Sequence, residues 1–282
     1  MQKSFKDPKP TLYIVSTPIG NLKDITYRAV ELLKQVDLIL AEDTRTSGVL
    51  LNHYDIRTPM ISYHQHNEFS RVPQILEHLE QGKDIALISD AGTPGISDPG
   101  FEMISKVIEK GYHVVSIPGA SAVLTALVSS GLSLETFTFI GFLPRKVGDL
   151  KKALADYKHL KQTLVIYESP QRIAKTLGYL YEVFQNRSVV LCRELTKTFE
   201  TIIRTDLEQA QNMEHDTRGE YVIIIDGNTE KHPYESMDVI TLVHHFLSLG
   251  YEEKEALKQA AKHKKTTKSE IYKIYKIKQQ NT

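Results

Sequence analysis

The chain contains very little cysteine and no long hydrophobic run. Cys192 is the single cysteine among 282 residues, which excludes an internal disulfide framework and suits a reducing compartment. No stretch approaches the ~18 apolar residues of a membrane span, and the first ten residues lack an apolar signal core. We therefore expect a soluble, cytoplasmic protein without membrane contact. Its length suits about two domains.

Several familiar sequence motifs are also missing. No G-x-G-x-x-G follows the first apolar run, and no G-x-x-x-x-G-K-[ST], CxxC or HExxH occurs, so common dinucleotide, triphosphate and zinc sites are not indicated. His64 and His66 could form half of a metal site, but no third ligand lies nearby in the sequence. We predict no metal, and expect these histidines to form hydrogen bonds or to line a substrate face. Cys192 is interpreted as buried packing.

The net charge of zero hides a strong asymmetry. Residues 254–282 contain nine lysines and two glutamates, a net charge of +7, which leaves −7 on the rest of the chain. A basic end on an acidic body is typical of contact with a polyanion. A solvated lysine-rich tail explains the charge equally well.

The most unusual segment is a loop at residues 89–100. Its twelve residues, SDAGTPGISDPG, include three glycines, two prolines, two aspartates and two serines. It follows an apolar run at 85–88 and precedes a helical pattern. Such a loop at the carboxyl end of a strand is where an open α/β sheet binds a small ligand. An ordinary strand–helix connection is the alternative, but such connections are usually shorter.

The first part of the chain alternates strands and helices. Strands are predicted at residues 12–16, 38–41, 60–63, 85–89 and 113–117, with helices at 24–36, after 45, at 68–81 and at 99–110. This pattern predicts a mostly parallel sheet in a first α/β domain, residues 1–130. Because parallel strands end at one edge, the polar turns that follow them should converge on one cleft.

The pattern then changes twice. Strands at 137–140, 164–167, 189–193, 200–204 and 220–225, with helices only at 146–157 and 173–184, predict a second α/β domain with a mixed sheet, residues 131–229. Residues 230–282 predict a small basic unit of three helices at 237–249, 252–263 and 269–278. Thr267 and Glu270 fit a capping box, and Ile271, Ile274, Tyr275 and Lys278 fall on one face of the last helix. Such a unit could be helix-turn-helix-like.

Seven motifs occur in an order that resembles the tetrapyrrole-methylase superfamily, and within it the bacterial RsmI-type enzymes. They are STPIGNL (16–22), AEDTR (41–45), the 89–100 loop, PGAS (118–121), YESP (167–170), RELTK (193–197) and GEYV (219–222). The resemblance covers residues 10–227. It implies two α/β domains with a cofactor cleft between them, usually in a homodimer. It also implies S-adenosylmethionine-dependent methylation of a cytidine 2′-hydroxyl in small-subunit (16S) ribosomal RNA.

Carried over by motif, the resemblance implies a set of cofactor-binding residues. They are Pro18, Asp90, Gly92, Thr93, Ile96, Gly119, Ser121, Ala122, Tyr167 and Gly219. Two departures bear on function. Thr93 replaces the aspartate of tetrapyrrole-specific relatives, which favours the RNA branch. Relatives often have histidine at the position of Gln171, so the glutamine argues against a catalytic role for this position.

Polar residues beside the expected cleft are candidates for proton transfer, each with a structural alternative. The candidate catalytic residues are Glu42, Asp43, Arg45 and Asp98. Asp98 precedes a helix and could instead be its N-cap, as Asp90 could cap the loop. Glu42, Asp43 and Arg45 could form an ion pair that holds two loops together.

Basic residues are the candidates for RNA contact. They are Arg145, Lys146, Arg193, Lys197, Lys264, Lys265 and Lys268. Phe142 could stack on a base beside Arg145 and Lys146, or be a core residue beside a surface pair. Arg193 and Lys197 could bind phosphate or cover the second sheet.

Two alternative functions remain open at this point. The first is an enzyme of the same fold that acts on a tetrapyrrole or a modified protein side chain. The second is an RNA-binding assembly factor without enzymatic activity. The basic C-terminal unit argues against the first, and the Gly/Pro/Asp-rich loops argue against the second.

Overall fold

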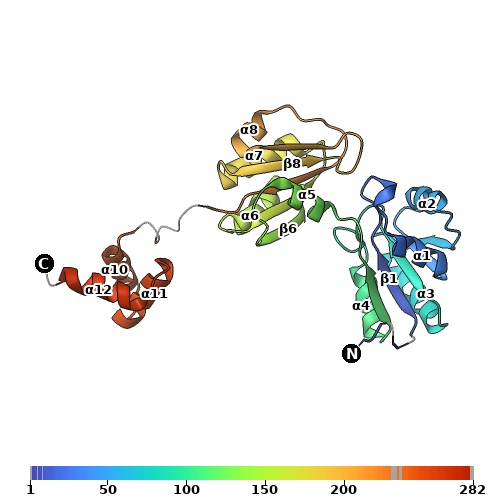
Figure 1. Cartoon of the computed structure of the whole chain (residues 1–282), viewed down its shortest axis with the longest axis horizontal. Coiled ribbons are helices and arrows are strands. Elements are labelled where there is room, and N and C mark those ends of the chain that lie inside the picture. Colours follow the sequence, from blue (N-terminus) through green and yellow to red (C-terminus); the bar gives the residue numbers. More distant parts are fainter. Residues whose placement is uncertain (1, 5, 8, 230–233, 235–236, 280–282) are drawn as a thin grey trace. The chain divides into compact units, whose positions relative to one another are not determined.

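The computed structural model describes residues 2–4, 6–7, 9–229, 234 and 237–279, without the side chains of 277–279 (Figure 1). The chain forms two compact units, Met1–Asn228 and Thr229–Thr282. Among the described residues, no helix has the length and apolar character needed to cross a membrane. The predicted start of the basic C-terminal unit, at residue 230, lies outside the described residues.

The first unit begins with a five-stranded parallel sheet, as predicted. In chain order its strands are β1 (Thr11–Val15), β2 (Leu38–Ala41), β3 (Met60–Ser62), β4 (Ile85–Ile88) and β5 (His113–Ile117). In space they run β3-β2-β4-β1-β5, and every neighbouring pair is parallel. All four residues of β2 and of β4 are buried, because helices cover both faces of the sheet.

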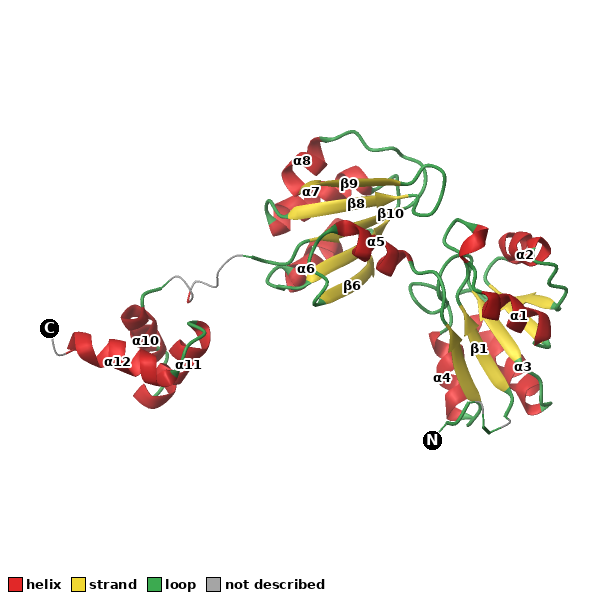
Figure 2. Cartoon of the chain, viewed as in Figure 1, coloured by secondary structure: helices red, strands yellow, loops and turns green. Residues whose placement is uncertain are grey.

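The helices of this sheet divide between its two faces (Figure 2). Helices α1 (Tyr27–Gln35) and α2 (Thr44–His53) pack in one core, whereas α3 (Glu68–Glu80) and α4 (Phe101–Glu109) pack in the other. Neighbouring strands β1 and β4 are therefore followed by helices on opposite faces. The loops that follow these two strands diverge, and such a switch point leaves a crevice at the carboxyl edge.

The second sheet of this unit is mixed, again as predicted. Its strands are β6 (Phe137–Phe142), β7 (Thr163–Glu168), β8 (Ser188–Arg193), β9 (Thr201–Asp206) and β10 (Tyr221–Ile225). They lie in the order β6-β7-β10-β8-β9, and only β6 and β7 are parallel. Helices α6 (Val147–Tyr157), α7 (Ile173–Phe184) and α8 (Leu207–Asn212) pack on one face.

The other face is covered by α5 (Ala122–Ser130), a helix that the sequence analysis did not predict. Val123, Ala126 and Leu127 of α5 pack with Val165 and Val190 of the second sheet. The expected first domain, 1–130, would include this helix, but its packing associates it with the second sheet. The division between the two layers therefore falls between β5 and α5. Helix α8 was also not predicted.

The C-terminal unit contains the three expected helices: α10 (Val239–Ser248), α11 (Glu253–His263) and α12 (Lys268–Gln279). Their core includes Leu242, Phe246 and Leu257. On the face predicted for the last helix, Ile271 and Tyr275 are buried, whereas Ile274 is 45% exposed. The side chain of Lys278 lies outside the described residues.

The capping box expected before α12 forms in part. The Thr267 hydroxyl accepts a hydrogen bond from the Glu270 N–H at 3.3 Å. The Glu270 carboxylate, however, accepts from the hydroxyl of Thr266. The helix start is therefore capped by Thr267 without the return bond to the Thr267 backbone.

Candidate functional site

The loops after β1 and β4 are joined directly. Thr17 and Gly92 exchange two backbone hydrogen bonds, of 2.8 Å from the Thr17 N–H and 3.1 Å from the Gly92 N–H. The hydroxyl oxygens of Ser16 and Thr93 are 2.7 Å apart. Gly92 has a φ of +78°, which favours glycine at this position. The first motif and the 89–100 loop are thus held as one structure.

A third loop passes close to the end of β1. A Cβ atom on Gly119 would lie 2.8 Å from the Cβ of Ser16, closer than real side chains approach. Gly119 therefore lets the loop after β5 pack against β1. It does not line either pocket described below, so its predicted contact with a cofactor is replaced here by a role in bringing loops together.

These loops and the second sheet enclose a pocket of about 350 Å³ within the first unit. Six of the predicted cofactor residues line it: Gly92, Thr93, Ile96, Ser121, Ala122 and Tyr167. Asp98 also lines it, and Ile19, Leu195 and Val222 add apolar surface. We call this space the first pocket. Turns that are distant in the sequence therefore meet around one cavity.

Tyr167 has an anchored ring in this pocket. Its ring packs edge-on against Phe139 and Phe142, with centroid separations of 4.9 and 5.5 Å. Burial raises the pKa of Tyr167 to about 12, against the lowering effect of a hydrogen bond with the Val123 backbone. The phenol is therefore neutral at ordinary pH and serves as a rigid wall rather than a base. Phe142 is 58% exposed, so its interpretation as a core residue is wrong.

A second pocket of about 470 Å³ shares Ile19, Ala91 and Glu220 with the first. Pro18 and Asp90, both predicted to contact the cofactor, lie in this second pocket. Lys197 also lines it. The remaining wall comes mainly from α2 and the loop after β1, through Gly20, Leu22, Thr46, Ser47, Val49 and Leu50.

Three carboxyl groups, Glu42, Asp90 and Asp98, interact electrostatically beside the two pockets. Burial, followed by the neighbouring Glu42, raises the pKa of Asp98 to about 7, against a hydrogen bond with Ser89 that lowers it. Burial and the Asp90 charge raise the pKa of Glu42. Burial and the Asp43 charge raise the pKa of Asp90. A carboxyl that titrates near neutrality can exchange a proton with a substrate.

Two expectations for the aspartates fail. The N-cap of α4 is Gly100 and no side chain caps it, so Asp98 is not the cap of this helix. Asp43 caps α2 by accepting the Arg45 N–H at 2.8 Å, and its carboxylate also pairs with the Arg45 guanidinium at 2.7 Å. This pair lies within one helix start and does not join two loops. The bond that joins them runs from the Asp43 N–H to the Asp90 carboxylate, 3.1 Å long.

The pairing with Arg45 also determines the protonation state of Asp43. Hydrogen bonds from the Arg45 side chain and backbone lower the pKa of Asp43 to about 2. Arg45 is exposed, and neither residue lines the pockets. Among the four predicted catalytic residues, Asp98 therefore lines a pocket and Glu42 lies beside it, whereas Asp43 and Arg45 form the start of α2.

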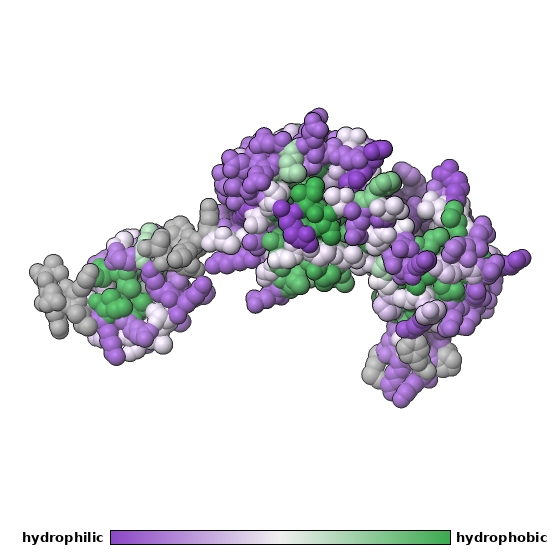
Figure 3. All heavy atoms as spheres, turned by 45° about the horizontal axis from the view of Figure 1, so that its top comes forward, coloured by the Kyte–Doolittle hydropathy of each residue, from purple (hydrophilic) through white to green (hydrophobic). Residues whose placement is uncertain are grey.

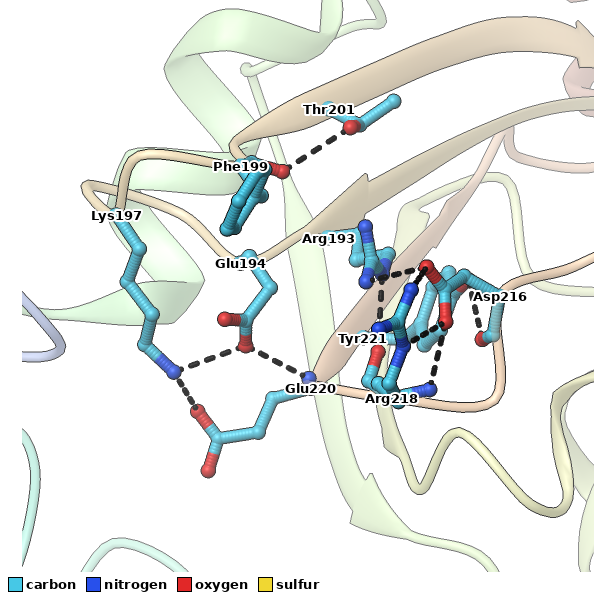
Figure 4. Close-up of polar contacts among 9 residues, drawn as sticks. All are labelled: Arg193, Glu194, Lys197, Phe199, Thr201, Asp216, Arg218, Glu220 and Tyr221. Carbon is cyan, nitrogen blue, oxygen red and sulfur yellow. Dashed lines mark hydrogen bonds and ion pairs between the residues drawn. The ribbon is translucent and has the colours of Figure 1, made fainter.

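Lys197 belongs to a compact ionic cluster with Glu194 and Glu220 (Figure 4). Its ammonium is 2.9 Å from Glu194 and 3.1 Å from Glu220. A Cβ atom on Gly219 would lie 2.5 Å from the Glu194 carboxylate, and one on Gly20 would lie 2.5 Å from the Lys197 side chain. Gly219 thus leaves room for this cluster. It does not line either pocket, and its predicted contact with the cofactor stays a prediction.

Arg193, by contrast, points into a separate cluster (Figure 4). It pairs with Asp216 at 2.9 Å and donates to the Arg218 carbonyl at 2.9 Å. Its side chain is 15% exposed. Arg193 therefore fastens the turn at 216–218 to the second sheet, and this arrangement does not favour its predicted role in binding phosphate.

The other predicted RNA contacts differ in their surroundings. Arg145 and Lys146 are exposed after β6, close in sequence to the pocket residue Phe142. In the C-terminal unit, Lys264 donates to the carbonyl of Met237. Lys265 is exposed, and Lys268 begins α12. Lys264 thus has a structural partner within its own unit.

The expectations for histidine and cysteine can be compared directly with the structure. His64 Nε2 lies 3.3 Å from the amide of Asn67, and its ring lies edge-on to His66. No cluster of three or more metal-ligating side chains occurs in the described part of the chain. Cys192 is fully buried, and burial raises the pKa of its thiol to about 11. The interpretation of Cys192 as buried packing is confirmed.

The sequence analysis missed several lining residues. Ser47 lies just after the AEDTR motif, whereas Leu195 and Glu220 lie inside motifs that had been noticed. Motif membership could have drawn attention to the last two. Nothing in the local pattern distinguishes Ser47 from other helical serines.

Comparison with known proteins identifies relatives across almost the whole chain. Residues 11–211 match the family of Tetrapyrrole (Corrin/Porphyrin) Methylases. The chain is 47% identical over 277 residues to the ribosomal RNA small subunit methyltransferase I of Halalkalibacterium halodurans, covering 96% of each sequence. It is 42% identical over 288 residues to the protein of the same name from Bacillus subtilis, covering 99% of each.

Solved structures support the fold independently. A diphthine synthase matches with a TM-score of 0.60 at 13% identity, covering 77% of this chain and 90% of that one. The cobalt precorrin-4 methyltransferase matches with a TM-score of 0.54 at 20% identity, covering 77% and 94%. At these identities the likeness concerns the fold alone. Together with the sequence matches, it shows that the chain belongs to the tetrapyrrole methylase family and, within it, groups with the ribosomal RNA small subunit methyltransferases I.

Proposed function

We propose that this protein is an S-adenosylmethionine-dependent methyltransferase that methylates the 2′-hydroxyl of a cytidine in small-subunit (16S) ribosomal RNA. The observation that carries the proposal is the first pocket, where the motifs shared with the family meet. The near full-length identity to ribosomal RNA small subunit methyltransferases I supports the substrate class.

The first pocket has the chemistry that S-adenosylmethionine requires. Its walls combine apolar side chains, such as Ile96, Tyr167 and Val222, with residues of the loops at 91–93 and 121–122. Asp98 adds a carboxyl group, and a carboxylate or a carbonyl suits a positively charged sulfonium. When bound, this cofactor supplies an activated methyl group. The residues of the chain hold the reactants in line and exclude water.

Among the predicted catalytic residues, Asp98 is the best candidate for accepting the proton that the ribose hydroxyl loses. It lines the first pocket, and its pKa of about 7 lies near the pH at which a general base is most effective. Glu42 supports it by raising that pKa. Lys197 is not suited to accept this proton, because its carboxylate partners raise its pKa and keep it charged.

The C-terminal unit is the proposed contact with RNA outside the cleft. Its net positive charge arises from lysines on α11, α12 and the turn between them. Such a surface binds phosphates without reading sequence. The substrate can be naked RNA or an assembled 30S subunit, and Arg145 and Lys146 would meet phosphates near the cleft.

We also infer that two copies of the chain associate as a homodimer. Helix α5 buries one face on the second sheet, yet Leu124 and Val128 on its outer face are 54% and 71% exposed. Leu134, shortly after the helix, is 51% exposed. Figure 3 shows hydrophobic side chains at the surface of the part that holds the second sheet. An exposed apolar face on a soluble enzyme is typical of an interface.

Calorimetry with S-adenosylmethionine, followed by methyl incorporation into small subunits from a cell lacking this protein, tests the proposal. We expect binding and the transfer of one methyl group to a ribose. Thr93→Arg should fill the first pocket and abolish cofactor binding. Binding without RNA methylation would favour an enzyme for tetrapyrroles or a modified protein side chain, and no binding would favour an assembly factor.

A further inference from the structure

The wall of the second pocket contains a buried hydroxyl group without a hydrogen-bond partner. Ser47, in the first turn of α2, is 3% exposed, and its Oγ has no partner among the described residues. Helical serines commonly bond to a carbonyl of the preceding turn, and a buried polar group left unpaired is unfavourable. The Oγ atom itself is buried in this structure, so a ligand in the second pocket would supply the missing hydrogen bond only after a small movement of the pocket wall.

The rest of the second pocket suits a flat ring with a polar edge. Leu22, Val49 and Leu50 supply apolar surface, whereas Thr46, Asp90 and Lys197 supply hydrogen-bonding groups. Enzymes that act on a nucleotide taken out of its stack read the base in this way, with apolar contacts on its faces and hydrogen bonds along its edge. Ile19, Ala91 and Glu220 line both pockets, so the second pocket adjoins the first.

We propose that the second pocket holds the base of the nucleotide that is methylated, and that Asp90 distinguishes cytosine from uracil. One Asp90 oxygen accepts the Asp43 N–H at 3.1 Å, which fixes the carboxylate at the pocket wall. A carboxylate accepts a hydrogen bond from the exocyclic amino group of cytosine. It repels the carbonyl oxygen that uracil carries at the same place. This inference rests on the proposed function and adds the residue that selects the base.

The first test is a change of specificity. Methyl transfer is measured with small subunits that carry either cytidine or uridine at the position that the wild-type enzyme methylates. In Asp90→Asn the amide oxygen can still accept the Asp43 N–H, while its nitrogen can donate to uracil. We expect the preference for cytidine in kcat/KM to fall at least about tenfold, with cofactor affinity unchanged. An unaltered preference would overturn the role of Asp90.

The second test fills the pocket. Val49 is 63% exposed on α2, so Val49→Trp can extend into the pocket without disturbing a core. We expect methylation to fall about a hundredfold or more while S-adenosylmethionine still binds. Ile108→Trp, at a 56% exposed site in the last turn of α4, is the matched control. Normal methylation by Val49→Trp would overturn the subsite, since the base could not then occupy the filled space.

Ser47→Ala separates a ligand contact from a structural role. If the hydroxyl bonds to the base, KM for the subunit should rise several-fold while Tm is kept, because no intramolecular bond is lost. A lower Tm with unchanged KM would contradict the assignment.

A wild-type protein that neither binds the cofactor nor methylates subunits would refute the proposed function itself. Wild-type activity with unaffected Val49→Trp and Asp90→Asn variants would refute only the base subsite.

Discussion

At the scale of single residues, the site depends on carboxyl groups that the fold removes partly from water. Burial is the largest cause of the raised pKa of both Asp98 and Glu42; the charge of Glu42 raises the pKa of Asp98 further, and the charge of Asp90 raises the pKa of Glu42 further. Such shifts disfavour the charged folded state and therefore cost stability. They are the sort of perturbation expected where a proton must be exchanged.

Asp98→Asn should lower activity and raise stability at the same time. Loss of a general base typically lowers kcat by about 10²–10⁴-fold. In the wild type the rate should fall as pH drops through about 7, where Asp98 becomes protonated. The pH profile of kcat, measured for both forms with saturating cofactor, checks this. A variant with wild-type kcat would exclude Asp98 as the proton acceptor.

The effect on stability has a definite sign. The folded pKa of Asp98, about 7, lies above its ordinary value of 3.8, so the folded chain holds a proton that the unfolded chain releases in this window. The contribution of Asp98 to stability therefore falls as pH rises from 3.8 to about 7. We expect Asp98→Asn to be more stable than the wild type above pH 7, with the difference vanishing in acid. Thermal unfolding of both proteins across this pH range measures the difference. A difference that grows as the pH falls would contradict the prediction.

Gly219→Ala should destabilise the chain more than a matched glycine replacement. Both Gly219 and Gly82 have left-handed backbone, with φ of +88° and +84°, so alanine costs about 1–2 kcal/mol at either position. At Gly219 the new Cβ would also collide with the Glu194 carboxylate, whereas nothing lies within 4 Å at Gly82. The free energy of unfolding in urea measures both. Equal losses of unfolding free energy in the two variants would show that the Glu194 side chain moves away from the new Cβ without any cost in stability.

At the scale of elements, α5 connects the site with the proposed interface. Ser121 at its N-cap and Ala122 in its first turn line the first pocket, and its inner face packs on the second sheet. The outer face carries Leu124 and Val128. A partner bound there would restrict the helix whose first turn lines the pocket.

Replacing Leu124 and Val128 together with lysine should give a folded monomer. Both side chains are exposed, and surface replacements usually change stability by no more than about 0.5 kcal/mol. Light scattering during gel filtration gives the mass, and circular dichroism verifies folding. Ile108→Lys on α4 is the control and should keep the mass of the wild type. A double variant that remains dimeric would locate the interface elsewhere.

At the scale of the whole molecule, the protein combines an α/β unit that contains both pockets with a separate basic helical unit. Residues 1–228 have their own cores, and the C-terminal helices have another. The proposed function assigns the methyl transfer to the first unit and the contact with RNA outside the pockets to the second.

Removal of residues 231–282 should weaken RNA binding and reduce its salt dependence while leaving cofactor affinity nearly intact. The slope of log K against log salt is negative, and each phosphate contact that is lost reduces its magnitude by about 0.7–0.9. Binding of a small-subunit RNA fragment at several salt concentrations provides the slope, and calorimetry provides the cofactor affinity. Loss of cofactor binding on truncation would mean that the C-terminal unit supports the core fold.

The sequence by itself determined the alternation of strands and helices, both sheet types and the loops that meet at the first pocket. These follow from local causes: buried strands must be apolar, and glycine, proline and aspartate mark turns. It did not reveal α5, whose segment AVLTALVSS is apolar on both its inner and outer faces and so lacks the polar stripe of a surface helix.

Tertiary structure alone decided which polar residues act together. Arg193 and Lys197 are neighbours in one motif, yet they lie in different ionic clusters because the turn after β8 directs them apart. Burial raises the pKa of Asp98, and so does the charge of Glu42, which is distant in the sequence and follows a different strand. Burial and long-range pairing arise only when the chain has folded. The protonation states of these side chains and their ionic partners could therefore not be predicted from motifs alone.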